Sequence, residues 1–198
     1  MTVPHHPAIA ARELILGGQK SGKSRRAEQL AAAWLAQSPA HQAVLIATAQ
    51  AHDAEMRARI ARHQRERAAR VPGLRTVEVP HDLADALAAH GSAHTLVVVD
   101  CLTLWLTNWR MPFENFEQNM PLTQDWQAQE AMFLQALQES PGPVVLVGNE
   151  IGLGVIPLGA EVRAFVDALG TLNQRVAQVC TRVTLMAAGL PLCLKESA

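Results

Sequence analysis

Short runs of uninterrupted apolar residues recur along the 198-residue chain, separated by longer stretches with helical spacing. Strands without polar alternation are buried on both faces, which is typical of parallel sheets covered by helices. We therefore predict an α/β fold, a mainly parallel sheet with helices on both faces. The predicted strands are 14–16, 44–47, 96–99, 144–147 and 183–186, and the predicted helices are 23–37, 53–69, 82–90, 126–139 and 160–180.

The composition excludes several classes of protein. Hydrophobic residues make up 49% of the chain and charged residues 18%, which excludes a disordered chain. The formal net charge of -1 argues against a nucleic-acid partner. No apolar run approaches the roughly 20 residues that a membrane span needs. The three cysteines form no CxxC pair and no secretory signal is visible, so we predict a cytoplasmic protein.

The chain is predicted to form one folded unit. Residues 1–11 contain two prolines and two histidines and are predicted to be a flexible tail. Residues 12–198 are predicted to form a single α/β domain. The polar segment 109–125 has two prolines and no clear period, so we predict a loop. It is either a lid over a site or a surface excursion without a function.

A glycine-rich segment lies between the first predicted strand and the first predicted helix. It satisfies the pattern G-x-x-x-x-G-K-[ST], which in this context predicts phosphate binding by backbone N–H groups and the helix start. Lys23 is expected to be a catalytic residue at the β- and γ-phosphates, and Ser24 is expected to hold Mg²⁺. A chance Gly/Ser turn is the alternative. The segment consists of Gly17, Gly18, Gln19, Lys20, Ser21, Gly22, Lys23 and Ser24.

Polar residues end two other predicted strands. Asp100 follows the run 96–99, and Asn149 and Glu150 come soon after the run 144–147. Ligands of open α/β sheets bind at the carboxyl ends of the strands. Asp100 is therefore a candidate second ligand of Mg²⁺, and the alternative is that it caps a following helix. Asn149 and Glu150 are likewise either metal-binding residues or caps of a following helix.

An arginine-rich stretch contains one histidine of interest. Seven arginines lie between positions 57 and 75, and most are predicted to lie on a solvated helix face. A neutral imidazole can attack phosphorus, and nearby arginines would offset the developing charge, so His63 is a candidate nucleophile. The alternative is a packed, structural histidine. One stripe of this helix is predicted to face the body of the protein, and it consists of Met56, Ile60, His63 and Arg67.

Four sequence stretches occur in order over nearly the whole chain from about residue 13. They read GGQKSGKS, VLIATAQAHDAEMRARIARHQRER, VVVDCLTLWLTN and VVLVGNEIGLGVIPLGAEVRAFVDALGTLNQRVA. Together they resemble the bifunctional adenosylcobinamide kinase/adenosylcobinamide-phosphate guanylyltransferase family of cobalamin biosynthesis. The phosphate loop is common to many NTPases, whereas the second and fourth stretches are far more specific.

The resemblance implies a P-loop NTPase fold of the recombinase type, in subunits that form homo-oligomers. It implies that the enzyme phosphorylates adenosylcobinamide, a corrinoid, with ATP or GTP. It further implies transfer of GMP from GTP to the new phosphate through a covalent adduct with His63. The resemblance places the guanine nucleotide against residues 17–24, Thr48, Gln64, Arg65, Glu66, Arg67, Glu78 and Asp100.

Two other functions stay open from the residues alone. The chain could be a simple P-loop kinase of small molecules in which His63 is structural. It could also be a non-enzymatic or switch-type nucleotide-binding module, in which the arginine-rich stretch binds an acidic partner or RNA. The near-neutral total charge argues against the second alternative.

Overall fold

The structure is a computed structural model that describes residues 8–51, 53–111 and 124–197. One seven-stranded sheet organises these residues, with the strand order β3-β2-β4-β5-β1-β6-β7. Neighbouring strands are parallel except for β7, which is antiparallel to β6. The strands are β1 (Arg12–Gly17), β2 (Gln42–Ala47), β3 (Leu74–Glu78), β4 (Thr95–Asp100), β5 (Val144–Val147), β6 (Arg182–Ala187) and β7 (Leu190–Glu196).

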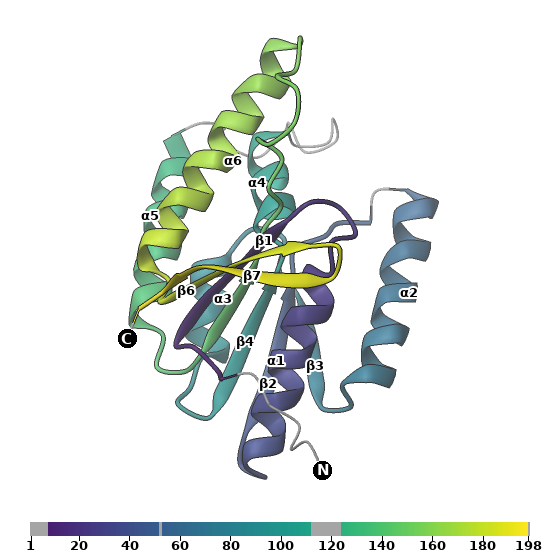
Figure 1. The fold of residues 1–198 in the computed structure, drawn as a ribbon, viewed down its shortest axis with the longest axis vertical. Helices are drawn as coiled ribbons and strands as arrows, with labels where there is room; N and C mark the ends of the chain where they lie inside the picture. Colours follow the sequence, from purple (N-terminus) through teal and green to yellow (C-terminus); the bar gives the residue numbers. More distant parts are fainter. Residues whose placement is uncertain (1–7, 52, 112–123, 198) are drawn as a thin grey trace.

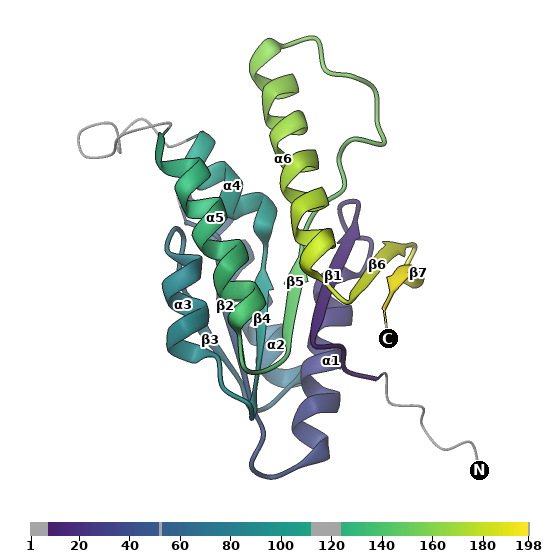
Figure 2. The ribbon, with the colours of Figure 1, turned by 90° about the vertical axis from the view of Figure 1, so that its left-hand side faces the viewer.

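Helices cover both faces of the sheet, so the predicted fold class is confirmed (Figure 2). On one face Leu14 and Leu16 of β1 pack with apolar residues of α3, α4, α5 and α6. On the other face Ile15 packs with residues of α1. The central strands are buried on both sides, which explains their uninterrupted apolar sequence. The helices are α1 (Lys23–Gln37), α2 (Ala54–Arg70), α3 (Leu83–His90), α4 (Leu102–Arg110), α5 (Gln124–Glu139) and α6 (Ala160–Val179).

All predicted strands and helices are present, and their ends differ from the prediction by at most two residues. Three elements were not predicted, namely β3, α4 and β7. The loop predicted over 109–125 is wrong at both ends. Trp109 belongs to α4 because its indole packs in the core, and Gln124 begins α5. Residues 112–123, and with them the question of a lid, lie outside the described residues.

The predicted tail 1–11 lies mostly outside the described residues, and residues 8–11 form neither helix nor strand. Within the described chain, no helix combines the length and the apolar character that crossing a membrane requires. The N-terminal half of α6 and the connection that precedes it rise beyond the sheet (Figure 1). Several apolar side chains of this connection are exposed, including Val155 at 96% and Leu158 at 98%.

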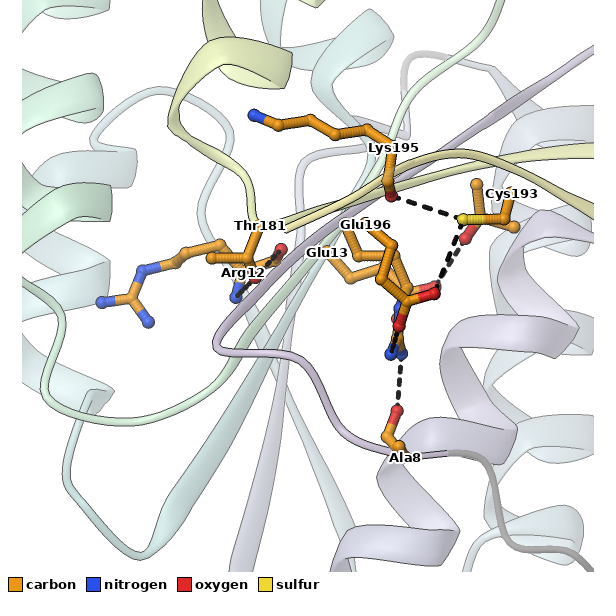
Figure 3. Close-up of polar contacts among 9 residues, drawn as sticks. Ala8, Arg12, Glu13, Thr181, Cys193, Lys195 and Glu196 are labelled. Atoms are coloured by element: carbon orange, nitrogen blue, oxygen red, sulfur yellow. Dashed lines mark hydrogen bonds and ion pairs between the residues drawn. The ribbon is translucent and has the colours of Figure 1, made fainter. Parts of the chain in front are cut away.

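A buried ion pair joins β1 to the C-terminal hairpin of β6 and β7 (Figure 3). Glu13 is fully buried, accepts a hydrogen bond from the Thr184 hydroxyl at 2.9 Å and lies 3.4 Å from Arg182. The Arg182 guanidinium also contacts Glu196 and the carbonyl of Ala8, each at 2.6 Å. These contacts compensate the buried charge of Glu13, which would otherwise be costly.

We predict that the three cysteines differ strongly in reactivity. Burial raises the pKa of Cys101 to about 11 and that of Cys180 to about 12, whereas Cys193 is exposed. At pH 8 only about one Cys101 thiol in a thousand would be ionised, and the thiolate is the reactive form. Iodoacetamide at pH 8 should therefore label Cys193 in the native protein and the other two only after unfolding, as peptide mass spectrometry can measure. Native labelling of Cys180 at the rate of Cys193 would contradict this packing.

Candidate active site

The predicted phosphate loop lies between β1 and α1, at the carboxyl edge of the sheet. Gly17 and Gly22 have φ angles of 149° and 103°, which favour glycine. A Cβ on Gly17 would lie 2.5 Å from the Met186 carbonyl oxygen, so a side chain there would clash. The Lys23 ammonium is buried and donates to the Gly18 carbonyl at 2.7 Å. Burial lowers the pKa of Lys23, an effect that Cys101 and Asp100 partly oppose.

Asp100 ends β4 and faces the first turn of α1. The Ser24 hydroxyl lies close enough to the Asp100 carboxylate to lower its pKa, so the structure brings the two predicted magnesium ligands together. Burial raises the pKa of Asp100, although Ser24, Arg67 and His63 each act in the opposite direction. The alternative role of Asp100 as a helix cap is wrong. The cap of α4 is Cys101, whose Sγ accepts a hydrogen bond from the N–H of Leu104 at 3.5 Å.

Thr48 follows β2 and is fully buried beside the end of β4. Its hydroxyl donates to the carbonyl of Cys101 at 2.7 Å and accepts from the N–H of Cys101 at 2.9 Å. Its own N–H donates to the carbonyl of Asp100 at 3.2 Å. In the structure, Thr48 therefore fixes the backbone that carries Asp100.

The helix α2 presents the predicted stripe to the protein. Met56, Ile60 and His63 are partly buried and Arg67 is buried, whereas the other described side chains of α2 are exposed. This confirms the predicted orientation of the helix. His63 also lies close enough to Asp100 to act on its charge. Gln64, the next residue, donates to Glu78 at the end of β3, so this part of α2 lies at the carboxyl edge of the sheet, as the phosphate loop does.

A buried glutamate of α1 holds α2 in place. Glu28 accepts two hydrogen bonds from Arg70, at 2.7 and 3.1 Å, and lies 3.6 Å from the Nε of Arg67. Arg67 also donates to the hydroxyl of Thr76 on β3 at 3.1 Å. Arg67, a predicted nucleotide contact, therefore spans α2, α1 and β3 in the structure.

Of the remaining predicted nucleotide contacts, the structure brings some into contact with one another and leaves the others apart. Gln64 donates to the carboxylate of Glu78 at 3.1 Å, which joins α2 to the end of β3. Glu66 instead lies 3.5 Å from Arg70 on the outer side of α2, and Arg65 is exposed. Gln19 and Lys20 are exposed at the top of the phosphate loop.

Several residues that shape this edge were missed by the sequence analysis. Asn108 of α4 donates to the carbonyls of Thr48 and Pro80, at 2.8 and 2.9 Å, and so ties the ends of β2 and β3 together. Glu28 was missed because its partners lie about 40 positions away. Asn108 ends one of the four sequence stretches that carry the family resemblance, and Glu28 lies in the predicted helix 23–37. Residue spacing alone does not reveal contacts between such distant segments.

A parallel sheet with a glycine-rich phosphate loop after its first strand defines a P-loop nucleotide-binding protein. Solved structures with the same fold include the flagellar accessory protein FlaH from Methanocaldococcus jannaschii, with a TM-score of 0.51 and 12% identity over 96% of this chain and 80% of that one. A protein of Pyrococcus horikoshii matches with a TM-score of 0.53 and 6% identity over 96% of this chain and 89% of that one. These likenesses concern the fold alone.

Sequence comparison identifies the family. Residues 13–194 match the family model "Cobinamide kinase / cobinamide phosphate guanyltransferase", and the chain belongs to this family. It is 46% identical to the bifunctional adenosylcobalamin biosynthesis protein CobP of Pseudomonas aeruginosa, over 93% of this chain and 97% of the relative. It is 34% identical to the corresponding protein CobU of Escherichia coli, over 92% of this chain and 98% of the relative. The resemblance stated from the four sequence stretches is therefore confirmed.

We predict that Glu28→Gln loosens α2 because Arg67 would lose its buried counter-charge. Breaking a buried pair by removing one partner costs about 3 kcal/mol. Urea unfolding should show a loss of this order, and amides of α2 should exchange faster with deuterium. The control is Glu66→Gln, whose exposed pair with Arg70 contributes less than about 1 kcal/mol. Equal stability of the two variants would contradict the role of Glu28.

Proposed function

We propose that the chain carries out both reactions of its family, using one nucleotide site for the two. In the first reaction, the hydroxyl of adenosylcobinamide receives the γ-phosphoryl group of ATP or GTP. In the second, GMP from GTP is transferred to the new phosphate, giving adenosylcobinamide-GDP and pyrophosphate. The proposal is carried by one arrangement: His63 adjoins Gln64, which donates to Glu78 at the carboxyl end of β3, and the phosphate loop and Asp100 lie at the same edge of the sheet.

The phosphate loop is proposed to hold the triphosphate in both reactions. Backbone N–H groups of residues 17–22 and the start of α1 would surround the phosphates, and Lys23 would leave Gly18 to contact the β- and γ-phosphates. The other proposed nucleotide contacts are Thr48, Gln64, Arg65, Glu66, Arg67, Glu78 and Asp100. The hydrogen bond between Gln64 and Glu78 supports a common surface at the end of β3.

The residues at the end of β4 fit a magnesium ion. Ser24 and Asp100 supply a hydroxyl and a carboxylate oxygen, the ligand type that Mg²⁺ binds, and they lie close enough for Ser24 to lower the pKa of Asp100. Within the described part of the chain, no three His, Cys, Asp or Glu residues gather into a metal site, so phosphates and water would complete the coordination. When bound, Mg²⁺ offsets negative charge on the phosphates. Ser24 and Asp100 would orient it.

His63 is proposed to be the nucleophile of the second reaction. Its imidazole nitrogen would attack the α-phosphorus of GTP, forming a phosphoramidate bond as the bond to pyrophosphate breaks. The phosphate of adenosylcobinamide-phosphate would then attack the same phosphorus and free the histidine. Placement of His63 on the inner stripe of α2, close to Asp100, supports this role.

We predict that His63→Ala separates the two reactions. The native chain incubated with α-labelled GTP should acquire an acid-labile, base-stable label, and His63→Ala should not. Phosphorylation of adenosylcobinamide should persist in His63→Ala and be lost in Lys23→Ala, because Lys23 contacts the transferred phosphoryl group.

The control for this experiment is His94→Ala, at the opposite edge of the sheet where β4 begins, which should label normally. A label that survives in His63→Ala would overturn the nucleophile. Absence of label in the native chain, with kinase turnover intact, would favour a simple P-loop kinase.

The chain is further proposed to form a cytoplasmic homo-oligomer. The connection before α6 exposes Leu153, Val155, Ile156 and Leu158, and apolar groups of this number on one projecting segment are typical of an interface. Contact with a second copy of the chain would bury them. Sedimentation equilibrium should give a mass above that of one chain, and Leu153→Ser with Leu158→Ser should lower it. A single-chain mass for the native protein would contradict the proposal.

A further inference from the structure

The end of β5 lies at the centre of the active-site edge. In the sheet, β5 is paired with β1, which leads into the phosphate loop, and with β4, which ends at Asp100. Asn149 and Glu150 follow β5 directly after Gly148. Because the carboxyl ends of parallel strands meet at one edge, a side chain here lies between the two phosphate-handling elements.

Buried polar side chains fix the backbone at this point. The N–H of Asn149 donates to the hydroxyl of Thr103 at 2.9 Å, and the amide of Asn173 donates to the carbonyl of Asn149 at 3.1 Å. Thr103 and Asn173 are 9% and 5% exposed. The N–H of Glu150 donates to the carbonyl of Gly17, the first residue of the phosphate loop, at 3.1 Å. The position of Glu150 relative to the loop is therefore set by the backbone.

The carboxylate of Glu150 is also oriented. One oxygen accepts a hydrogen bond from the N–H of Gly152 at 2.8 Å, which closes a short turn after the strand. A carboxylate offers two oxygens with about four acceptor positions, so this bond leaves capacity for a ligand. Asp100, by contrast, lies beside the Ser24 hydroxyl, and Glu28 accepts hydrogen bonds from Arg70.

We propose that Glu150 is a catalytic residue of the kinase reaction and accepts the proton of the acceptor alcohol. This inference rests on the kinase step of the proposed function. The hydroxyl oxygen attacks the γ-phosphorus, the bond from that phosphorus to the bridging oxygen of the nucleoside diphosphate breaks, and the hydroxyl proton passes to the Glu150 carboxylate. After the phosphorylated alcohol and the diphosphate leave, the Glu150 carboxyl group loses this proton to water.

The test is a comparison of Glu150→Gln and Glu150→Asp. The amide oxygen of Gln can still accept from Gly152, and the bond to Gly17 uses the backbone, so Glu150→Gln removes only the proton acceptor. Loss of a general base lowers kcat by about 10²–10⁴-fold. We expect such a loss in kcat for adenosylcobinamide phosphorylation, with the KM values for nucleotide and alcohol little changed. Glu150→Asp should recover part of the rate because it keeps a carboxylate.

Labelling of the same variants by α-labelled GTP distinguishes proton acceptance by Glu150 from a purely structural role in which Glu150 supports the phosphate loop. Glu150→Gln should label like the native chain, because the His63 reaction does not use Glu150. The matched control is Glu161→Gln, an exposed carboxylate in the first turn of α6, which should keep both activities.

Four results would overturn the proposal. Glu150→Gln with native kcat would exclude a proton acceptor, and so would Glu150→Gln being as fast as Glu150→Asp. Equal loss of kinase turnover and GMP labelling would show that Glu150 only supports the phosphate loop. If the native chain does not phosphorylate adenosylcobinamide at all, the kinase assignment itself fails, and this inference fails with it.

Discussion

The close approach of three backbone segments at the phosphate loop is the constraint on which the rest of the site depends. Gly17 can lie against the Met186 carbonyl of β6 only because it has no Cβ, and a Cβ on Gly22 would lie 3.3 Å from the Cα of Gly189. The N–H of Gly189 donates to the carbonyl of Ser21 at 3.0 Å, and β5 contributes the bond from Glu150 to Gly17. The loop is therefore held on two sides before any nucleotide binds, which reduces the entropy lost on binding.

Charge balance explains how α2 is held beside this loop. Glu28 and Asp100 place two carboxylates near the end of β4, and Arg67, Arg70 and Lys23 place three cations around them. Because burial raises the pKa of Asp100, its charged form depends on Arg67, on Lys23 and on the Ser24 hydroxyl. A bound triphosphate would add negative charge on the loop side of Arg67. If Arg67 contacts the nucleotide as proposed, the nucleotide would compete with Glu28 for Arg67 and would couple the position of α2 to occupancy of the loop.

Most of the fold could be predicted because buried parallel strands have a strong apolar pattern in the sequence. The elements β3, α4 and β7 have no such recognisable pattern. Only Leu74 of β3 is buried, so that strand has no apolar run, and β7 is an exposed edge strand that contains Pro191. The helix α4 follows Asp100 after one residue, with no turn signal between them. The phosphate loop, Asp100 and the inner face of α2 follow from local pattern. The roles of Glu28 and Asn108 arise from contacts between distant segments, which no local pattern encodes.

The sheet order also explains how one loop could serve two reactions at different phosphorus atoms. A triphosphate held by residues 17–24 would place its α- and γ-phosphorus at different positions, and a reacting group must lie next to the phosphorus it acts on, so one side chain would not serve both. In the proposed scheme His63, on a helix beyond β4, acts on the α-phosphorus, and Glu150, in the segment that follows β5, acts at the γ-phosphorus. Asp100 ends β4, which lies beside β5, the strand that precedes Glu150. The strand β5, which lies between β1 and β4, would thus provide a second chemical group without displacing the carboxylate of Asp100, the proposed magnesium ligand.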